Sequence, residues 1–256
     1  MSEAHGTLWL VPNTLDLGVE SDAPLDATLS RGVIEQAAVL THWAVENAKT
    51  ARAFLKRVHA LQPLALPLQS IDIRELPRTP KDGTSPPSAS EWDRLLEPAR
   101  AGHSIGLLSE AGLPAVADPG AALVAAAHRA SIEVRPLPGP SSVTLALAAS
   151  GLHGQSFAFV GYLPTDAAQR AVRIRELEVR SRHERQTQIA IETPYRNAAL
   201  AGALLQALAP TTRLAIASGL TLRDGSCRLR TVAEWRDDPP SFGERPLPTV
   251  FLWLAS

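Results

Sequence analysis

The chain has 256 residues, of which 45% are hydrophobic and 20% are charged, so it can bury a sizeable core and global disorder is excluded. This length allows one large domain or two ordinary ones, and we expect two. The formal net charge of -1 gives no overall attraction to polyphosphate, so a nucleic-acid partner would need a local basic patch.

The lack of a secretory signal and the low cysteine count indicate a reducing compartment. The N-terminus lacks the basic segment and apolar run of a secretory signal, and no stretch approaches about 20 uninterrupted apolar residues. The single cysteine, Cys227, excludes an internal disulfide and a thiolate-rich metal site. We therefore expect no membrane span and a cytoplasmic protein.

The first part of the chain alternates short apolar runs with amphipathic segments, which predicts strands joined by helices over a largely parallel sheet. Strands are expected at 7–11 and 38–45, and helices at 29–37 and 47–59. The alternation then stops. Residues 63–90 contain prolines at 63, 67, 77, 80, 86 and 87 together with Asp82-Gly83, which predicts a mobile loop that serves as a lid or as a linker.

Order resumes after residue 90. The pattern predicts helices at 91–101, 120–130, 142–150, 167–182 and 197–209, and strands at 104–108, 132–136, 157–160, 188–191, 213–217, 228–232 and 249–254. Several of the later strands follow one another without a helix, which predicts a mixed sheet. We expect an α/β fold with an N-terminal domain of residues 1–138 and a C-terminal domain of residues 139–256.

Two loops that follow predicted strands are candidate binding sites. Residues 109–120 read Ser-Glu-Ala-Gly-Leu-Pro-Ala-Val-Ala-Asp-Pro-Gly, and residues 138–142 read Pro-Gly-Pro-Ser-Ser and open a helix. Ligands collect at the carboxyl ends of strands in an open parallel sheet, and free amides at a helix start attract anions. Ordinary turns and helix caps explain the same residues. The usual dinucleotide, P-loop, zinc-protease and nucleophile-elbow motifs are absent.

The region 106–164 resembles the tetrapyrrole methylase superfamily. The resemblance is carried by Leu-Leu-Ser-Glu-Ala-Gly-Leu-Pro-Ala-Val-Ala-Asp-Pro-Gly, Pro-Leu-Pro-Gly-Pro-Ser-Ser, Ala-Ala-Ser-Gly-Leu and Phe-Val-Gly-Tyr-Leu-Pro. Within the superfamily, the chain is most similar to the branch that methylates a ribose 2′-hydroxyl of small-subunit ribosomal RNA, which Ile-Glu-Thr-Pro-Tyr-Arg-Asn at 191–197 also resembles.

The resemblance implies a parallel N-terminal sheet, a mixed C-terminal sheet and S-adenosylmethionine bound in a cleft between the two domains, usually in a homodimer. The motifs that match imply the following residues for this cofactor: Pro12, Ser109, Glu110, Ala111, Pro114, Ala115, Asp118, Ser141, Ser142, Glu192, Thr193, Pro194, Pro248 and Thr249.

Departures from the family pattern lie mainly where the methyl acceptor would bind. Thr-Pro-Ile-Gly-Asn-Leu is replaced by Asn-Thr-Leu-Asp-Leu-Gly at 13–18, and Ala-Glu-Asp-Thr-Arg by Val-Glu-Asn-Ala-Lys at 45–49. Ala-Arg-Glu-Leu-Thr-Lys becomes Ala-Ser-Gly-Leu-Thr-Leu at 217–222, and Lys-Gly-Glu becomes Pro-Leu-Pro at 246–248. These losses suggest a changed acceptor or a lost reaction.

Methyl transfer from a sulfonium needs alignment more than a dedicated base. Glu46 and Lys49 are the candidates for a base, and a solvated helix start explains them equally well. Arginines at 170, 173, 175, 180, 182 and 185 form either a basic face for phosphate or a solvated helix interleaved with glutamates. The acceptor is therefore left open between ribosomal RNA and a small molecule such as a tetrapyrrole, and a cofactor-binding protein without turnover is the third alternative.

Overall fold

The computed structural model describes residues 5–16, 24–78 and 86–256 and divides into two compact units, Met1–Ser141 and Ser142–Ser256. The boundary expected from the sequence was placed after residue 138, a few residues before this division. Each unit is described by itself below.

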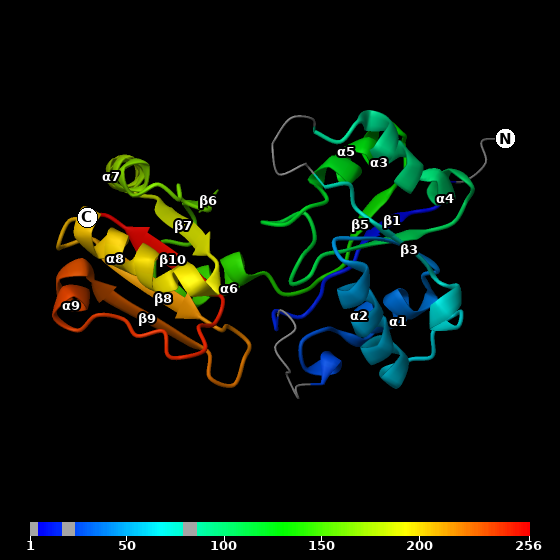
Figure 1. Ribbon diagram of the computed structural model, residues 1–256, viewed down its shortest axis with the longest axis horizontal. Coiled ribbons are helices and arrows are strands. Elements are labelled where there is room, and N and C mark those ends of the chain that lie inside the picture. Colours follow the sequence, from blue (N-terminus) through cyan, green and yellow to red (C-terminus); the bar gives the residue numbers. More distant parts are fainter. Residues whose placement is uncertain (1–4, 17–23, 79–85) are drawn as a thin grey trace. The chain divides into compact units, whose positions relative to one another are not determined.

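The first unit is built on one parallel sheet (Figure 1). Its strands are β1 (Leu8–Leu10), β2 (His42–Val45), β3 (Asp72–Glu75), β4 (Ile105–Leu108) and β5 (Val134–Pro136), in the order β3-β2-β4-β1-β5. All four pairings are parallel, as the alternating pattern predicted. The carboxyl ends of the five strands therefore lie along one edge of the sheet, where open α/β sheets bind ligands.

Helices cover both faces of this sheet (Figure 1). The helical segments are η1 (Leu25–Ala27), α1 (Arg31–Val39), α2 (Ala48–Leu61), η2 (Leu68–Ser70), α3 (Ala89–Leu95), α4 (Glu97–Arg100) and α5 (Ala121–Arg129). Successive strand residues point to opposite faces, so Trp43 and Val45 join the core under α1 and α2. Ala44 joins the core formed with α3 and α5.

Two sequence expectations for this unit were wrong. Residues 38 and 39 end α1 instead of starting a strand, because an apolar run cannot by itself distinguish a buried helix end from a strand. The region 63–90 was expected to be an unbroken loop, but it contains η2 and the edge strand β3, which pairs with β2. The Asp82-Gly83 turn signal lies outside the described residues.

The second unit is built on a mixed sheet of order β6-β7-β10-β8-β9, in which only β6 and β7 run parallel. The strands are β6 (Phe157–Gly161), β7 (Thr187–Glu192), β8 (Arg213–Ser218), β9 (Ser226–Thr231) and β10 (Thr249–Leu254). The helical segments are α6 (Ser142–Ser150), α7 (Ala167–Glu184), η3 (Pro194–Arg196), α8 (Asn197–Ala207) and α9 (Val232–Asp237). The mixed sheet expected from the sequence is confirmed, and α9 is an additional helix.

Alternate residues of the central strand β10 define the two faces of this sheet. Phe251 and Trp253 pack with α7, α8 and α9, whereas Val250 and Leu252 pack with α6. On α7, Arg173 pairs with Glu176 at 3.2 Å and Arg180 with Glu184 at 3.1 Å, and all four side chains are exposed. Across the described ranges, no helix is long and apolar enough to cross a membrane.

Candidate functional site

The carboxyl ends of three neighbouring strands, β4, β1 and β5, bring the two motif loops of the first unit together. The backbone N–H of Asn13, after β1, donates to the carbonyl of Gly112 at 2.9 Å, and the Gly112 N–H donates to the Thr14 carbonyl at 3.2 Å. The Asn13 side-chain amide donates to the carbonyls of Ser109 and Glu110 at 3.3 and 3.0 Å. The loop 109–120 is therefore fastened to the segment that follows β1.

The loop after β5 meets the same segment. A Cβ placed on Gly139 would lie 2.2 Å from the Cβ of Pro12, and one placed on Gly112 would lie 3.3 Å from the carbonyl oxygen of Pro140. Such spacings mean that the backbones are already in close contact. The turns at 109–120 and 138–142, about 30 residues apart in sequence, therefore form one continuous surface with Pro12.

The loop 109–120 holds an unusual backbone conformation. Gly112, Ala115 and Ala117 have φ values of 65°, and Gly120 has a φ of 129°. A left-handed φ costs an alanine about 1–2 kcal/mol, so the surrounding contacts must impose this shape. Strain of this kind is concentrated at binding loops and active sites.

Ser109 has a buried side chain that lacks a partner. The residue is 2% exposed, and its Oγ makes no hydrogen bond within the described part of the chain. A buried hydroxyl without a partner costs about 1–3 kcal/mol. A ligand with hydrogen-bonding groups that binds at the end of β4 would remove this cost, so the first motif loop fits a polar ligand.

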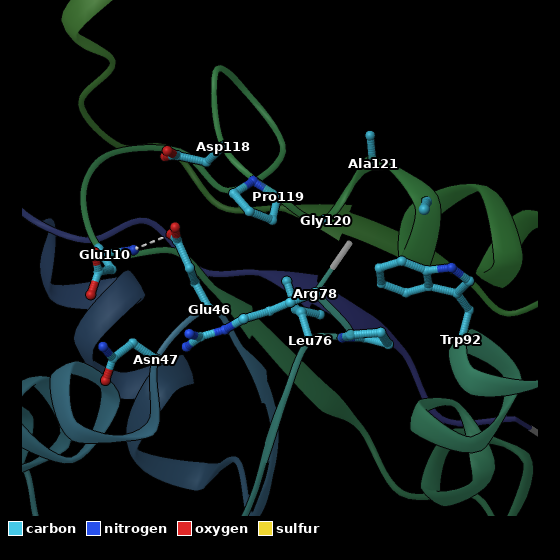
Figure 2. Close-up of a pocket in the computed structure, with 12 residues that line it drawn as sticks. Glu46, Asn47, Leu76, Arg78, Trp92, Glu110, Asp118, Pro119, Gly120 and Ala121 are labelled. Carbon is cyan, nitrogen blue, oxygen red and sulfur yellow. Dashed lines mark hydrogen bonds between the residues drawn. The ribbon is translucent and has the colours of Figure 1, made fainter. Parts of the chain in front are cut away.

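Three carboxylates gather beside this loop, in a pocket of about 650 Å³ (Figure 2). Glu46 follows β2 and accepts a hydrogen bond from the Glu110 N–H at 3.0 Å. Burial raises the pKa of Glu46, while the hydrogen bond from the Glu110 N–H lowers it and the charge of the Glu110 carboxylate raises it. Burial, followed by the charges of Glu46 and Glu110, raises the pKa of Asp118 to about 7. Among the described residues, no group of three or more His, Cys, Asp or Glu side chains could hold a metal ion.

The raised pKa of Asp118 has a consequence for stability. An aspartate whose pKa is near 3.8 when unfolded and about 7 when folded favours the folded state at low pH and loses that contribution as the pH rises through 7. Asp118→Asn should therefore be about 1–2 kcal/mol more stable than the parent at pH 8, since partial exposure screens the effect, and equal to it near pH 4. Denaturant unfolding at both pH values measures this, and equal stability at pH 8 would contradict it.

The predicted residues of the second unit also lie together. Thr249, at the start of β10, pairs in register with Glu192 at the end of β7 and with Ser218 on β8. Glu192 accepts from the Thr193 N–H at 2.9 Å and pairs with Arg196 at 3.2 Å. Asn197 donates to the carbonyl of Leu247 and to Thr249 Oγ1, and its own buried Oδ1 has no partner in the described residues.

The remaining candidate residues lie in different surroundings. Pro114 is buried, and Ala111 and Ala115 are half-buried in the same loop. Ser141 ends the first unit and Ser142 begins α6 of the second. Pro248 accepts a hydrogen bond from the Gly219 N–H at 2.9 Å. Of the two candidate bases, Glu46 lines the pocket, whereas Lys49 is exposed and does not.

Sequence reasoning did not identify several residues of these sites. Asn13 stood in a segment considered only as a lost family motif, part of which, residues 17 and 18, lies outside the described residues. Arg78 and Trp92 line the pocket, although they belong to regions regarded as a loop and a plain helix. Asn13 shortly after the first strand was the one signal in the sequence, because polar residues at the carboxyl ends of parallel strands gather at ligand sites.

The chain is similar to several known proteins. Residues 31–234 match the family model described as Tetrapyrrole (Corrin/Porphyrin) Methylases. A relative named Ribosomal RNA small subunit methyltransferase I, from Mesorhizobium japonicum, is 39% identical over 140 residues, which cover 53% of this chain and 46% of that protein. The protein of the same name from Mycobacterium bovis is 39% identical over 127 residues, covering 50% and 43%. The matched region thus spans less than half the length of each of these relatives.

Solved structures share the fold over nearly the whole chain. The methyltransferase CobJ has a TM-score of 0.59 at 16% identity and covers 98% of this chain and 95% of its own. Uroporphyrin-III C-methyl transferase from Thermus thermophilus, complexed with S-adenyl homocysteine, has a TM-score of 0.53 at 18% identity and covers 96% and 97%. The extent of the family match, together with this shared fold, shows that the chain belongs to the tetrapyrrole (corrin/porphyrin) methylase family.

Proposed function

We propose that the chain is an S-adenosylmethionine-dependent methyltransferase and that its acceptor is a ribose 2′-hydroxyl of small-subunit ribosomal RNA. The activity and the acceptor follow from the names of the relatives, which match over half of this chain. The observation that carries the proposal is the joining of Pro12, the 109–120 loop and the 138–142 turn at the ends of three adjacent strands. These relatives come from bacteria, whose ribosomal RNA lies in the cytoplasm, so we propose this location too.

The residues present fit the cofactor. We propose that Ser109, Glu110 and the backbone of the 109–120 loop bind it in the first unit, and that Glu192, Thr193 and Thr249 bind it in the second. The unpartnered Ser109 Oγ and Asn197 Oδ1 are available for its polar groups. When bound, the cofactor supplies an activated methyl group, so the chain has to align the acceptor and exclude water. Glu46, half-buried beside the loop, is proposed to assist with proton removal, and Lys49 is not.

Calorimetry with S-adenosylhomocysteine tests cofactor binding, and Ser109→Ala sharpens the test. Removing a buried hydroxyl that has no partner among the described residues should raise the unfolding free energy by about 1–2 kcal/mol. The same change should weaken S-adenosylhomocysteine binding about 5- to 10-fold, because a hydrogen bond to the ligand is lost.

Ser181→Ala is the matched control in the second unit. Its buried Oγ donates to the Gln186 carbonyl at 2.8 Å and accepts from the Ala255 N–H at 3.0 Å, so this change should lower stability without altering the affinity. Absence of binding to the parent protein at millimolar ligand would overturn the proposed function.

Methyl transfer to small-subunit RNA tests the acceptor. The protein, labelled S-adenosylmethionine and small-subunit RNA should yield label at a ribose 2′-oxygen. Label that appears only on a small molecule would contradict the RNA assignment. Tight binding of S-adenosylhomocysteine without any methyl transfer would mean that the protein binds the cofactor but is not an enzyme. The family resemblance also leads us to propose a homodimer, which sedimentation equilibrium measures directly.

A further inference from the structure

The pocket that contains the three carboxylates adjoins the surface formed by Pro12 and the two motif turns. It lies in the first unit at the carboxyl ends of β2, β3 and β4, whereas the two turns and Pro12 follow β4, β5 and β1. Its walls come from the residues after β2 and β3, from α3, from the loop after β4 and from the start of α5. The loop after β4 is shared, so an occupant of the pocket would lie next to the proposed cofactor-binding loop.

The size and walls of the pocket suit a flat, polar molecule. A volume of about 650 Å³ is within the range of small-molecule sites. The Trp92 indole lies at the end of the pocket opposite the carboxylates of Glu46 and Asp118, and Leu76 lies between them (Figure 2). An indole can stack on a nucleobase, which stabilises binding whatever the base.

The charges in the pocket exclude anionic occupants. Among the described residues that line the pocket, Glu46, Glu110 and Asp118 face the space together with one guanidinium, that of Arg78, which also pairs with Glu75 at 3.6 Å. A phosphate would be repelled here, and so would a tetrapyrrole whose ring carries several carboxylates. Hydroxyl groups would be attracted, because carboxylates are acceptors for their protons.

The Asp118 carboxylate is free to accept such a proton. It makes no hydrogen bond within the part of the chain that the structure describes, whereas Glu46 is held by the Glu110 N–H and Glu110 by the Thr50 hydroxyl at 3.2 Å. The groups that face Asp118 are Glu46 and Glu110, and Arg78 acts on Glu46. Burial, followed by the charges of Glu46 and Glu110, raises the pKa of Asp118 to about 7, so the group exchanges a proton near neutral pH.

We propose that this pocket is the acceptor subsite and takes one ribonucleoside, with its base against Trp92 and its sugar hydroxyls toward Glu46 and Asp118. This inference rests on the proposed methyltransferase function. In the reaction, a lone pair of the acceptor oxygen forms the bond to the methyl carbon as the carbon–sulfur bond breaks. The bonding pair stays on sulfur, which becomes a neutral thioether, and the hydroxyl proton passes to Asp118. The phosphates of the RNA remain outside the pocket.

Nucleoside binding to the full chain tests the subsite without relying on turnover. Uridine is the probe, because it lacks the adenine of the cofactor. Proton–nitrogen NMR spectra should show that uridine shifts the indole N–H signal of Trp92, identified by its absence in Trp92→Phe. Binding of 2′-deoxyuridine should be about 10-fold weaker, because a hydrogen bond to a charged group is lost, and uridine 5′-monophosphate should also bind more weakly. The titrations are run with and without S-adenosylhomocysteine.

Asp118→Asn probes the proton acceptor while preserving the shape of the side chain. It should remove the dependence of uridine affinity on pH between 6 and 8 and lower the single-turnover rate with RNA about 100-fold. Because Asp118 lies in the 109–120 loop, S-adenosylhomocysteine affinity is measured on the same variant, and the loss of rate should exceed any loss of that affinity. Glu35→Gln removes an exposed carboxylate on α1 that pairs with Arg31, and it should behave like the parent in every assay.

Three results would overturn the inference. In the first, the Trp92 indole N–H signal does not shift when uridine is added. In the second, 2′-deoxyuridine binds as tightly as uridine. In the third, uridine 5′-monophosphate binds more tightly than uridine. If any of them occurs while S-adenosylhomocysteine binds, the subsite is wrong and the proposed function stands. Failure of S-adenosylhomocysteine to bind would instead remove the proposed function, whatever uridine does.

Discussion

Trp43→Ala is expected to lower the unfolding free energy of the first unit by about 3–5 kcal/mol, the usual cost of truncating a buried Trp. Trp43 is 1% exposed and lies edge-on to Phe54, with ring centroids 6.2 Å apart. Its indole N–H donates to the Leu40 carbonyl at 3.2 Å, and its ring covers the backbone at Gly106, where a Cβ would lie 2.6 Å from it. The change would leave a cavity between the sheet and the helices and a buried carbonyl without a partner.

Hydrogen exchange of amides in β2 and β4 measures this loss within the first unit, because unfolding of a chain with two compact units need not be a single transition. Trp43→Phe keeps the aromatic contact and should cost much less. A loss below about 1 kcal/mol for Trp43→Ala would mean that the core of this unit relaxes freely around the missing ring.

Gly139→Ala is expected to weaken S-adenosylhomocysteine binding at least about 30-fold, equivalent to about 2 kcal/mol. The added Cβ would lie 2.2 Å from Cβ and 2.4 Å from Cγ of Pro12, whose ring cannot rotate away. The turn at 138–142 must therefore move, and a displacement of about 1 Å at a binding surface is enough to lose most of the affinity.

Gly154→Ala is the control for this change. A Cβ at Gly154 would meet nothing within 4 Å, so the same substitution there should leave S-adenosylhomocysteine affinity unchanged. If Gly139→Ala bound the ligand as well as Gly154→Ala, the turn after β5 would have no part in cofactor binding, and the proposed site would have to be reduced to the 109–120 loop.

The two sites divide the edge of one sheet between them. Residues after β1, β4 and β5 are proposed for the cofactor, and residues after β2, β3 and β4 for the acceptor. β4 is central to both because it lies between β1 and β2 in the sheet. A strand inserted in this way brings its loop into contact with both neighbours, which explains why the 109–120 loop contains the strained backbone and two of the three carboxylates.

The order of elements and the motif loops could be predicted from the sequence because their signals are local. Alternating strand and helix patterns predicted the parallel sheet, and strands without intervening helices predicted the mixed one. The edge strand β3 was missed because Asp72–Glu75 reads as polar and is flanked by prolines, so its pairing with β2 supplies what its own residues do not indicate. The break between α3 and α4 at Leu96 was missed as well, although Pro98 marks it.

The sequence by itself determined the family and the α/β class and singled out the loops proposed to bind the cofactor, since each depends on residues close together in the chain. Only the tertiary structure decided that Asn13 fastens the 109–120 loop and that Glu46, Glu110 and Asp118 share one pocket with Trp92. It also decided that Ser109 is buried and has no partner among the residues that the structure describes. Glu46 and Asp118 are 72 residues apart in sequence, and the raised pKa of Asp118 comes from burial and from charges that only folding brings near. Burial and proximity are properties of the packed chain, so no local pattern encodes them.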